Sequence, residues 1–396
     1  MRLLPACAAV VCVTVSAAGA DTFLVLPFSN SSRYPNINWV GESVSETLRE
    51  ALARQRLMII DREDREEAYS RLGIRHDATP TLATVMKIGQ SLDADQVIYG
   101  EFDLTAPPPG APITRGSLKI TAHVLDLRHT RQGPHFSETG ALQDLAGLQR
   151  HLAWRALQFV SPRSSPGEAD FARAWPQIRV EAIESYIRGL LAFSPDQKYK
   201  LFSQAVRLQP DYSQACYQLG MLEYAKKRYA AAAAWLEKVA QVDAHYRQAL
   251  FYLGICRFHA GDYAAAQTAF EQVASEVPLN EVFNNLGAAQ SRNNDPRALS
   301  SFAKALEGDS TDPAYHFNYG YELWKQGRFA AAADSFRAAL DRDPQDNEAK
   351  IMLGKCINHT GPRMADLKAG GLQRLKTNYE ENAYWQLKAA LQPDKK

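Results

Sequence analysis

Two regions of the chain differ in the spacing of their apolar residues. In residues 177–362, apolar positions recur at i, i+3, i+4 and i+7 over segments of about thirteen residues, which predicts amphipathic helices. In residues 21–160, short apolar runs and one alternating segment predict strands that lie between helices. The stretch between them, residues 161–176, is rich in proline and serine and predicts a linker. The pattern therefore predicts an α+β protein.

The N-terminal region is expected to form an α/β sandwich-type domain, in which helices pack on one mixed sheet. Its alternating segment, residues 117–127, places an apolar side chain at every second position, which is typical of a half-buried strand. The expected strands are 22–28, 57–61, 96–102, 117–127 and about 135–142. The expected helices are 39–54, 62–72, 82–92 and a segment that ends near Val160.

Glycine recurs through the helical region at nearly constant intervals. The glycines at 189, 220, 254, 287, 320 and 354 are spaced by 31, 34, 33, 33 and 34 residues. A period of this length is typical of stacked helical hairpins, in which a small residue lets two helices approach closely. The clearest units are 247–280 and 313–346, and each adds a Gly-Asp-Tyr or Gly-Arg-Phe turn and a late proline that ends the second helix.

This set of motifs resembles the tetratricopeptide repeat. Weaker units at 213–246 and 280–312 keep the same order of glycine, aromatic residue and alanine. The first unit, about 181–212, departs from the pattern through a shortened turn. The resemblance implies an all-α solenoid of five to six repeats over residues 177–362.

The end of the chain departs from the repeat pattern. Gly370 stands where the family has an aromatic residue. Because the last repeat of a solenoid otherwise exposes its apolar face, we expect residues 363–396 to form a C-terminal helix that caps the stack. The apolar stripe of this expected helix is Leu372, Leu375, Tyr379, Ala383, Leu387 and Leu391.

The N-terminal region carries a second resemblance. Its motifs are Val-Leu-Pro-Phe at 25–28, Trp-Val-Gly-Glu at 39–42, Ile-Ile-Asp-Arg at 59–62 and Ala-Asp-Gln-Val-Ile-Tyr-Gly-Glu-Phe at 94–102. They look like the N-terminal domain of TolB-like and FlgO-like proteins, and the curli secretion family has a similar layout. The resemblance covers nearly all of 21–160 and implies a small domain that mediates assembly in or near the cell envelope, without catalytic residues.

Residues 1–20 predict a cleaved secretory signal peptide. Arg2 precedes a mostly apolar stretch, and Ala18-Gly19-Ala20 is a small-x-small cleavage site. An uncleaved anchor or a lipidated Cys7 are the alternatives, but the stretch is short and rich in alanine for a membrane span. Cleavage after Ala20 predicts a periplasmic or secreted protein that does not span a membrane.

Composition and net charge indicate which classes of binding partner to expect. The chain is 46% hydrophobic and 22% charged, as globular proteins are. Its 45 Lys+Arg and 44 Asp+Glu leave a net charge of +1, which becomes 0 when Arg2 is removed with the signal peptide. Because its positive and negative charges nearly cancel, the chain has no overall electrostatic attraction for nucleic acid. We expect the remaining cysteines, Cys216, Cys256 and Cys356, to be buried thiols, with one disulfide as the alternative.

The sequence contains no recognised catalytic or cofactor motif. It lacks a P-loop, G-x-G-x-x-G and H-E-x-x-H. Ser43 follows a sequence that begins like a nucleophile elbow but lacks the closing glycine, so we interpret it as helix capping. Cys256–His259 and Cys356–His359 share a C-x-x-H spacing without further ligands, which indicates descent of the repeats rather than metal sites. We expect a protein that is not an enzyme and needs no metal or cofactor.

The resemblance to tetratricopeptide repeats also selects a candidate binding surface. In that family, set positions on the first helix of each repeat line a concave groove. The matching positions in this chain are strongly aromatic, which is typical of a peptide or protein docking site. Some family members clamp a terminal carboxylate with a set of lysines and asparagines, but this chain has Tyr, Phe, Asn and Phe at the fifth positions of its repeats and lacks that set. The candidate partner-binding residues are Tyr217, Met221, Tyr224, Phe251, Ile255, Phe258, Asn284, Phe317, Tyr321 and Trp324, with His259, Ser291, Arg292 and Lys325 at further groove positions.

Two interpretations of this groove stay open. It binds an external partner, or its aromatic residues pack internally, including against the chain's own last helix or its N-terminal domain. We expect an exported scaffold or assembly factor that docks a segment of an envelope or periplasmic protein, with homo-oligomerisation left open. The alternative is a small-ligand sensor that holds its ligand at the strand ends near Pro27–Asn30 and Gly100–Glu101.

Overall fold

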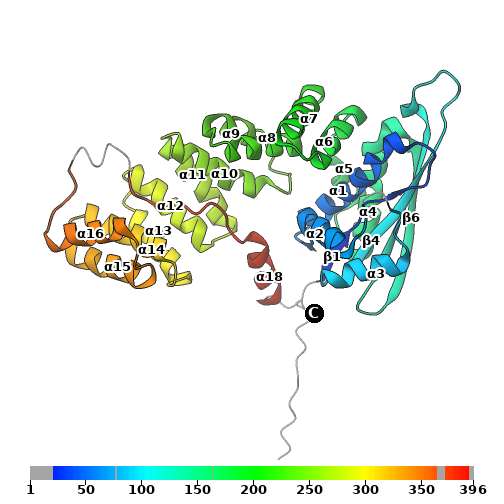
Figure 1. Ribbon diagram of the computed structural model, residues 1–396. Coiled ribbons are helices and arrows are strands. Elements are labelled where there is room, and N and C mark those ends of the chain that lie inside the picture. Colours follow the sequence, from blue (N-terminus) through cyan, green and yellow to red (C-terminus); the bar gives the residue numbers. More distant parts are fainter. Residues whose placement is uncertain (1–20, 76–77, 164, 364–370, 392–396) are drawn as a thin grey trace, which may run out of the picture.

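The computed structural model describes residues 21–75, 78–163, 165–363 and 371–391. A sheet with helices on both faces is followed by a curved row of helices (Figure 1). This arrangement confirms the α+β class predicted from the sequence. The signal peptide expected at 1–20 lies outside the described residues.

The sheet combines parallel and antiparallel strands in the order β3-β1-β4-β5-β6, with the short β2 also paired to β4. Strand β1 lies parallel to β3 and β4, whereas β4, β5 and β6 are antiparallel neighbours. Strand β6 begins earlier than expected because Arg131 already pairs with Asp126 of β5. The strands are β1 (Thr22–Val25), β2 (Ser29–Asn30), β3 (Met58–Ile59), β4 (Gln96–Thr105), β5 (Ser117–Asp126) and β6 (Arg131–Ala141).

Helices cover both faces of the sheet, because successive strand residues point to opposite sides. On one face, α1 and α4 pack Val44 and Leu152 against strand side chains that include Ile98. On the other face, α2 and α3 contribute Tyr69 and Ile88 to a separate apolar cluster. These helices are α1 (Trp39–Arg54), α2 (Arg62–Leu72), α3 (Leu82–Ser91) and α4 (Leu145–Val160), with 3-10 turns at Pro35–Ile37, Ile113–Arg115 and Leu142–Asp144.

The stretch 161–176, expected as a linker, is packed against its neighbours and contains α5 (Glu168–Arg173). The Trp154 indole donates a hydrogen bond to the Pro166 carbonyl at 3.2 Å. The Arg54 guanidinium lies over the Trp175 ring, 4.2 Å from its centroid. One apolar core continues from α1 into the first helices of the helical region, so the two regions share a packed interface.

The helical region is a row of hairpins in which each helix packs against the next. The repeated glycines at 189, 254 and 287 lie against a phenylalanine ring of the second helix of the same hairpin, as the predicted close approach requires. The helices are α6 (Val180–Leu191), α7 (Pro195–Leu208), α8 (Ser213–Ala225), α9 (Tyr229–Leu236), α10 (Tyr246–His259), α11 (Tyr263–Glu276), α12 (Asn280–Arg292), α13 (Ala298–Gly308), α14 (Pro313–Lys325), α15 (Phe329–Arg342) and α16 (Asn347–Ile357).

Two of the repeated glycines give a matched test of this packing. A Cβ atom on Gly254 would lie 2.7 Å from the Phe270 ring, whereas one on Gly354 would meet no described atom within 4 Å. We expect Gly254→Ala to lower the free energy of unfolding by about 1–3 kcal/mol, because it overpacks the hairpin. Gly354→Ala is expected to raise it by up to about 1 kcal/mol, because alanine is the better helix former. Urea unfolding of both variants checks the prediction, and equal effects would contradict it.

The C-terminal segment differs from the expected capping helix. Residues 371–380 are not helical, and α18 (Glu381–Leu391) begins only after them. The segment runs back along the row of helices toward the sheet instead of covering the end of the stack (Figure 1). Side chains of the repeats bind its main-chain N–H and C=O groups, and this replaces the pairing that a helix would supply internally.

The cysteines Cys216, Cys256 and Cys356 are buried free thiols, as expected. Burial raises the pKa of Cys216 and of Cys356 to about 11, so both thiols stay protonated at neutral pH. Over the part of the chain that the structure describes, no helix combines the length and apolar character that crossing a membrane needs.

Candidate functional site

The chain's own residues 371–380 occupy the face formed by the first helices of successive hairpins. We call this segment the strap, and we call the surface of α10, α12, α14 and the start of α16 that contacts it the groove. The strap passes α14 and α12 and then reaches α10 before α18 begins (Figure 1). The groove predicted from the sequence is therefore filled from within the molecule.

Three buried asparagines bind the main chain of the strap. Asn284 and Asn318 each donate from Nδ2 to the Arg374 carbonyl at 2.8 Å, and the Arg374 N–H donates to Asn318 Oδ1 at 2.8 Å. Asn285 donates to the Lys376 carbonyl at 2.8 Å and accepts from the Lys376 N–H at 2.7 Å. All three asparagines are 0% exposed, a depth at which an amide needs hydrogen-bond partners. An extended segment suits them, because its alternate residues present N–H and C=O on one side.

The two basic side chains of the strap meet acidic side chains of the repeats. Arg374 donates to both carboxylate oxygens of Asp346, at 2.5 and 2.8 Å, and its guanidinium lies 3.6 Å from the centroid of the Phe317 ring. The hydrogen bond from Arg374 holds the pKa of Asp346 below its ordinary value. Lys376 forms an ion pair with Asp312. The groove is therefore acidic where the strap is basic.

Two apolar side chains of the strap complete the contact. Leu375 packs against the apolar clusters that contain Phe251 and Phe302. The Tyr379 and Phe251 ring centroids lie 4.6 Å apart, and the Tyr379 hydroxyl donates to Glu381 at 2.6 Å. The strap thus places a leucine and a tyrosine, four residues apart, on aromatic side chains of the repeats.

Helix α18 extends the strap to the N-terminal region. Glu381 accepts a hydrogen bond from Arg247 of α10 at 2.5 Å and another from the Trp385 indole at 3.0 Å. The guanidinium of Arg56, from the N-terminal region, lies over the Trp385 ring at 4.2 Å from its centroid. The C-terminal segment therefore connects the repeats to the sheet domain.

Five of the predicted groove residues lie at the strap. Phe251, Asn284 and Phe317 contact it directly. Ile255 and Phe258 belong to the apolar cluster that Leu375 and Tyr379 join. None of these side chains is exposed in the presence of the strap.

The other five predicted residues pack between neighbouring hairpins. Tyr217 stacks on His245 with ring centroids 4.6 Å apart, and Met221 and Tyr224 join the same apolar cluster. Tyr321 and Trp324 are 4% and 2% exposed and belong to the core of the last hairpins. For these five, internal packing is what the structure shows.

The four further positions divide in the same way. Ser291 accepts a hydrogen bond from Gln373 of the strap at 2.9 Å, and Lys325 donates to Ser291. His259 stacks on an aromatic ring of α9, and Arg292 lies over a tyrosine of α11, so both serve the packing of hairpins.

Sequence reasoning missed two of the three asparagines, Asn285 and Asn318. Each lies two residues before a repeated glycine, Gly287 and Gly320 respectively. The sequence contains a signal that could have identified them, because an asparagine recurs at the same inward-facing position in two consecutive repeats. A buried amide that recurs in this way needs a partner that the repeats themselves do not supply.

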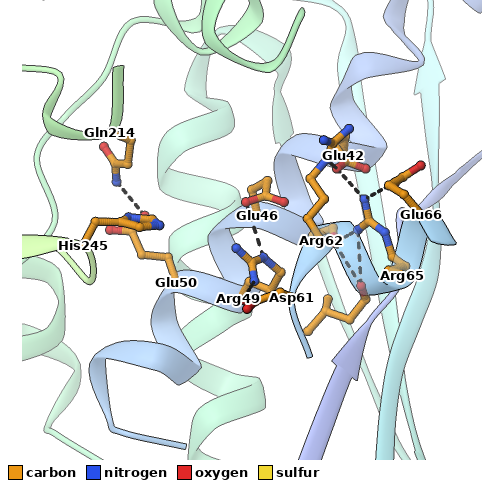
Figure 2. Close-up of polar contacts among 12 residues, drawn as sticks. Glu42, Glu46, Arg49, Glu50, Asp61, Arg62, Arg65, Glu66, Gln214 and His245 are labelled. Carbon is orange, nitrogen blue, oxygen red and sulfur yellow. Dashed lines mark hydrogen bonds and ion pairs between the residues drawn. The ribbon is translucent and has the colours of Figure 1, made fainter. Parts of the chain in front are cut away.

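A second polar site lies between the sheet domain and the repeats, where a cavity of about 360 Å³ is lined by charged side chains (Figure 2). Arg49 forms ion pairs with Glu46 and Asp61 at 3.4 and 3.5 Å, and Glu50 accepts a hydrogen bond from Gln214 at 2.6 Å. Burial raises the pKa of Glu50. Across the described residues, no three His, Cys, Asp or Glu side chains are grouped so as to hold a metal ion. The Glu50–Gln214 hydrogen bond joins the two regions across this cavity.

The half-buried His245 is a titratable side chain at this interface. Burial disfavours its charged form, but the hydrogen bond that the His245 Nδ1–H donates to Asp243 at 3.2 Å and the negative charge of Asp243 outweigh burial and raise the pKa of His245 above 6.5. A raised pKa stabilises the folded state below pH 6.5, and this contribution is lost as the pH rises through the raised value. We expect the Tm to fall as the pH rises above about 6.5, and His245→Gln to flatten that fall. Thermal melts at several pH values check it, and equal slopes in both proteins would contradict it.

Helices α1 and α2 are joined by a buried ion pair (Figure 2). Arg65, which is 1% exposed, donates to Glu42 at 2.6 Å and to Glu66 at 2.9 Å and reaches the Val25 carbonyl at 3.5 Å. Arg62 also donates to Glu42, at 2.8 Å. Burial disfavours the ionised form of Glu42, but the charges of Arg65 and Arg62 outweigh burial and lower its pKa. The pair fixes both helices to the first strand.

The strand ends expected to hold a ligand in the sensor alternative are filled by Phe28, which is 3% exposed. A Cβ atom on Gly100 would lie 2.4 Å from the Phe28 ring, and one on Gly41 would lie 2.0 Å from the Phe28 carbonyl oxygen. The space near Pro27–Asn30 and Gly100–Glu101 is thus occupied by the protein itself.

Comparison with protein families matches two tetratricopeptide repeat models, one at residues 200–244, 285–347 and 317–394 and the other at 223–289. Comparison with curated proteins gives no match. Among solved structures, MamA from Desulfovibrio magneticus RS-1 is 20% identical with a TM-score of 0.36, over 40% of this chain and 92% of that chain. YrrB, a TPR protein with an unusual peptide-binding site, is 20% identical with a TM-score of 0.34, over 49% and 93%. The C-terminal domain of LpoB from Salmonella enterica is 15% identical with a TM-score of 0.24, over 31% and 84%.

Proposed function

We propose that this chain, whose helical region consists of tetratricopeptide repeats, is a non-enzymatic interaction scaffold whose groove docks an extended segment of a partner protein. The observation that supports the proposal is the binding of the strap, since Asn284, Asn285 and Asn318 hold main-chain groups that every extended peptide possesses. Main-chain hydrogen bonds supply affinity in such complexes, and side-chain subsites supply specificity.

The proposal further places the protein in the cell envelope after export. It rests on the signal peptide predicted at residues 1–20 and on the resemblance of residues 21–160 to TolB-like and FlgO-like domains. In this role the α/β domain holds a second envelope partner. Two modest contacts on one chain raise the effective concentration of each partner for the other.

The groove is tested by crosslinking the exported full chain in cells and mapping the crosslinked peptides by mass spectrometry. The double variant Asn285→Ala with Asn318→Ala removes the amides of the groove. Asn347→Ala is the matched control, because Asn347 is an exposed amide at the start of α16. We expect a partner crosslinked to α10, α12 or α14 in the native and control chains and lost in the double variant. A partner that the double variant retains would move the site to the α/β domain.

Export is tested separately by cell fractionation and N-terminal sequencing of the purified protein. We expect the mature chain to start at Asp21 and to be recovered outside the cytoplasm. A chain that keeps Met1 and stays in the cytoplasm would overturn the envelope role while leaving the docking role intact.

A further inference from the structure

We propose that the segment docked by the groove has the pattern Arg-Leu-Lys-x-x-Tyr in an extended conformation, and that the chain's own copy of this pattern, residues 374–379, competes with the partner for the groove. The inference rests on the proposed function and names the chemistry of its partner. The asparagines read any extended main chain, so the choice of partner falls to the side-chain subsites.

The charged subsites of the groove are the first determinant of which peptide sequence it binds. The Arg374 subsite combines two carboxylates, Asp346 at 2.5 Å and Glu348 at 3.2 Å, with the face of Phe317 beneath the guanidinium. This arrangement matches the planar fork of arginine, which binds a carboxylate through two parallel hydrogen bonds. The Lys376 subsite pairs Asp312 with the Tyr315 ring, 4.9 Å from the ammonium nitrogen. An acidic segment placed here would meet carboxylates at both positions.

The spacing of the apolar subsites is the second determinant of which peptide sequence the groove binds. Leu375 and Tyr379 reach apolar side chains of the repeats, and the distance between their subsites fixes the register of the peptide. A shift by one residue would bring the leucine to a carboxylate subsite and a basic residue to an apolar one. Register is strongly specified where alternate side chains meet such different surroundings.

Because the strap belongs to the same chain, an external segment must compete with it for the groove. A segment of the same chain is present at a high effective concentration, in the millimolar range for a short connection. The apparent affinity of an external segment is reduced by the fraction of molecules in which the groove is free. Weakening the strap therefore strengthens partner binding without any change in the groove.

The test measures binding of a fluorescein-labelled synthetic peptide with the sequence of residues 371–381 to the full chain by fluorescence anisotropy. Arg374→Glu with Lys376→Glu in the chain releases the strap by charge repulsion and leaves the groove untouched. We expect this released chain to bind the peptide at least about 10-fold more tightly than the native chain does. A peptide that carries the same two glutamates is expected to bind at least about 10-fold more weakly than the native peptide.

The acidic subsites have a matched control. Asp312, Asp346 and Asp262 each accept a hydrogen bond from the first turn of a helix, and asparagine keeps that cap. In the released chain, Asp312→Asn with Asp346→Asn is expected to weaken peptide binding at least about 10-fold. Asp262→Asn is expected to leave peptide binding unchanged, because Asp262 contacts the Ala265 N–H and Arg257 within the repeats. Circular dichroism confirms that each variant keeps its helices.

Each contrary outcome has a distinct meaning. If the released chain binds native and charge-reversed peptides equally, the charge pattern is overturned while peptide docking stands. If it binds neither peptide but selects other sequences from a random peptide library, the Arg-Leu-Lys-x-x-Tyr pattern is overturned and the proposed function survives. If no library peptide binds, both proposals fall. If the native chain forms a dimer that the released chain cannot form, the occupant is the strap of a second copy, which overturns the assignment to a partner.

Discussion

Replacing Asn318 with leucine is expected to free the strap and to raise the hydrogen-exchange rate of residues 371–380 by at least about 30-fold, which corresponds to about 2 kcal/mol. Asn318 exchanges two hydrogen bonds with the main chain of Arg374 and donates a third to Asn284 Oδ1 at 2.7 Å. Leucine has the same branched shape at Cγ and no polar atom, so the repeat core stays filled, while the Arg374 N–H loses its partner. A buried donor left without a partner costs about 1–3 kcal/mol.

The exchange measurement has an internal reference and a matched variant. Helix α15 lies away from the strap, so its exchange rates should not change. Asn347→Leu introduces the same substitution at an exposed position of α16 and should leave the strap protected. Unchanged protection of residues 371–380 in the Asn318→Leu chain would show that the asparagines do not hold the strap.

Replacing Arg65 with methionine is expected to lower the free energy of unfolding by about 3–5 kcal/mol. The substitution leaves the carboxylate of Glu42, which is 5% exposed, with Arg62 as its remaining cationic partner, and it removes a donor from the Val25 carbonyl. Removing one member of a buried ion pair is far more costly than removing the pair, because the other charge stays buried. Urea unfolding monitored by circular dichroism measures the loss.

Two further variants separate the buried charge from a general effect of lost arginine. Arg71→Met removes an arginine from the same helix, but its side chain is 59% exposed and pairs with Glu67 at 3.7 Å, so we expect a change below about 0.5 kcal/mol. Glu42→Leu combined with Arg65→Met should recover part of the stability lost by Arg65→Met alone. A loss no larger than that of Arg71→Met would refute the role given to this pair.

The sequence predicted the repeat architecture because its signals are local. A glycine every 31 to 34 residues and a helical period of apolar positions are enough to predict stacked hairpins, and the structure has them. Strands of the N-terminal region were predicted for the same reason, because alternating apolar and polar residues indicate a strand with one buried face. Strand ends such as that of β6 differ, because pairing with a neighbour extends them, and the two-residue strand β2, which pairs with β4, was not predicted.

The candidate site was predicted only in part. Phe251, Asn284 and Phe317 follow from the repeat pattern, and they do line the surface that the strap occupies. Tyr217 and Trp324 follow from the same pattern, yet they pack between hairpins. Position within a repeat decides which helix face a residue lies on, whereas the neighbouring hairpin decides whether that face is free.

Residues 371–380 are not helical, although a C-terminal helix was predicted, and the contacts of the strap explain the difference. Leu372, Leu375 and Tyr379 have a helical spacing, and an isolated reading of the segment therefore favours a helix. In the folded chain, Asn285 and Asn318 offer hydrogen bonds to an extended main chain, and carboxylates offer partners to Arg374. Tertiary contacts of this strength outweigh a weak local preference.

The amino-acid sequence by itself determined the two-part α+β organisation and the hairpin repeat, because period and spacing are properties of neighbouring residues. Only the tertiary structure decided three other features. They are the packed junction at 161–176, the charged cavity between the regions and the strap in the groove. Each depends on pairs such as Asn284 and Arg374, which lie 90 residues apart. Whether such residues meet depends on the path of the whole chain, and no local pattern records it.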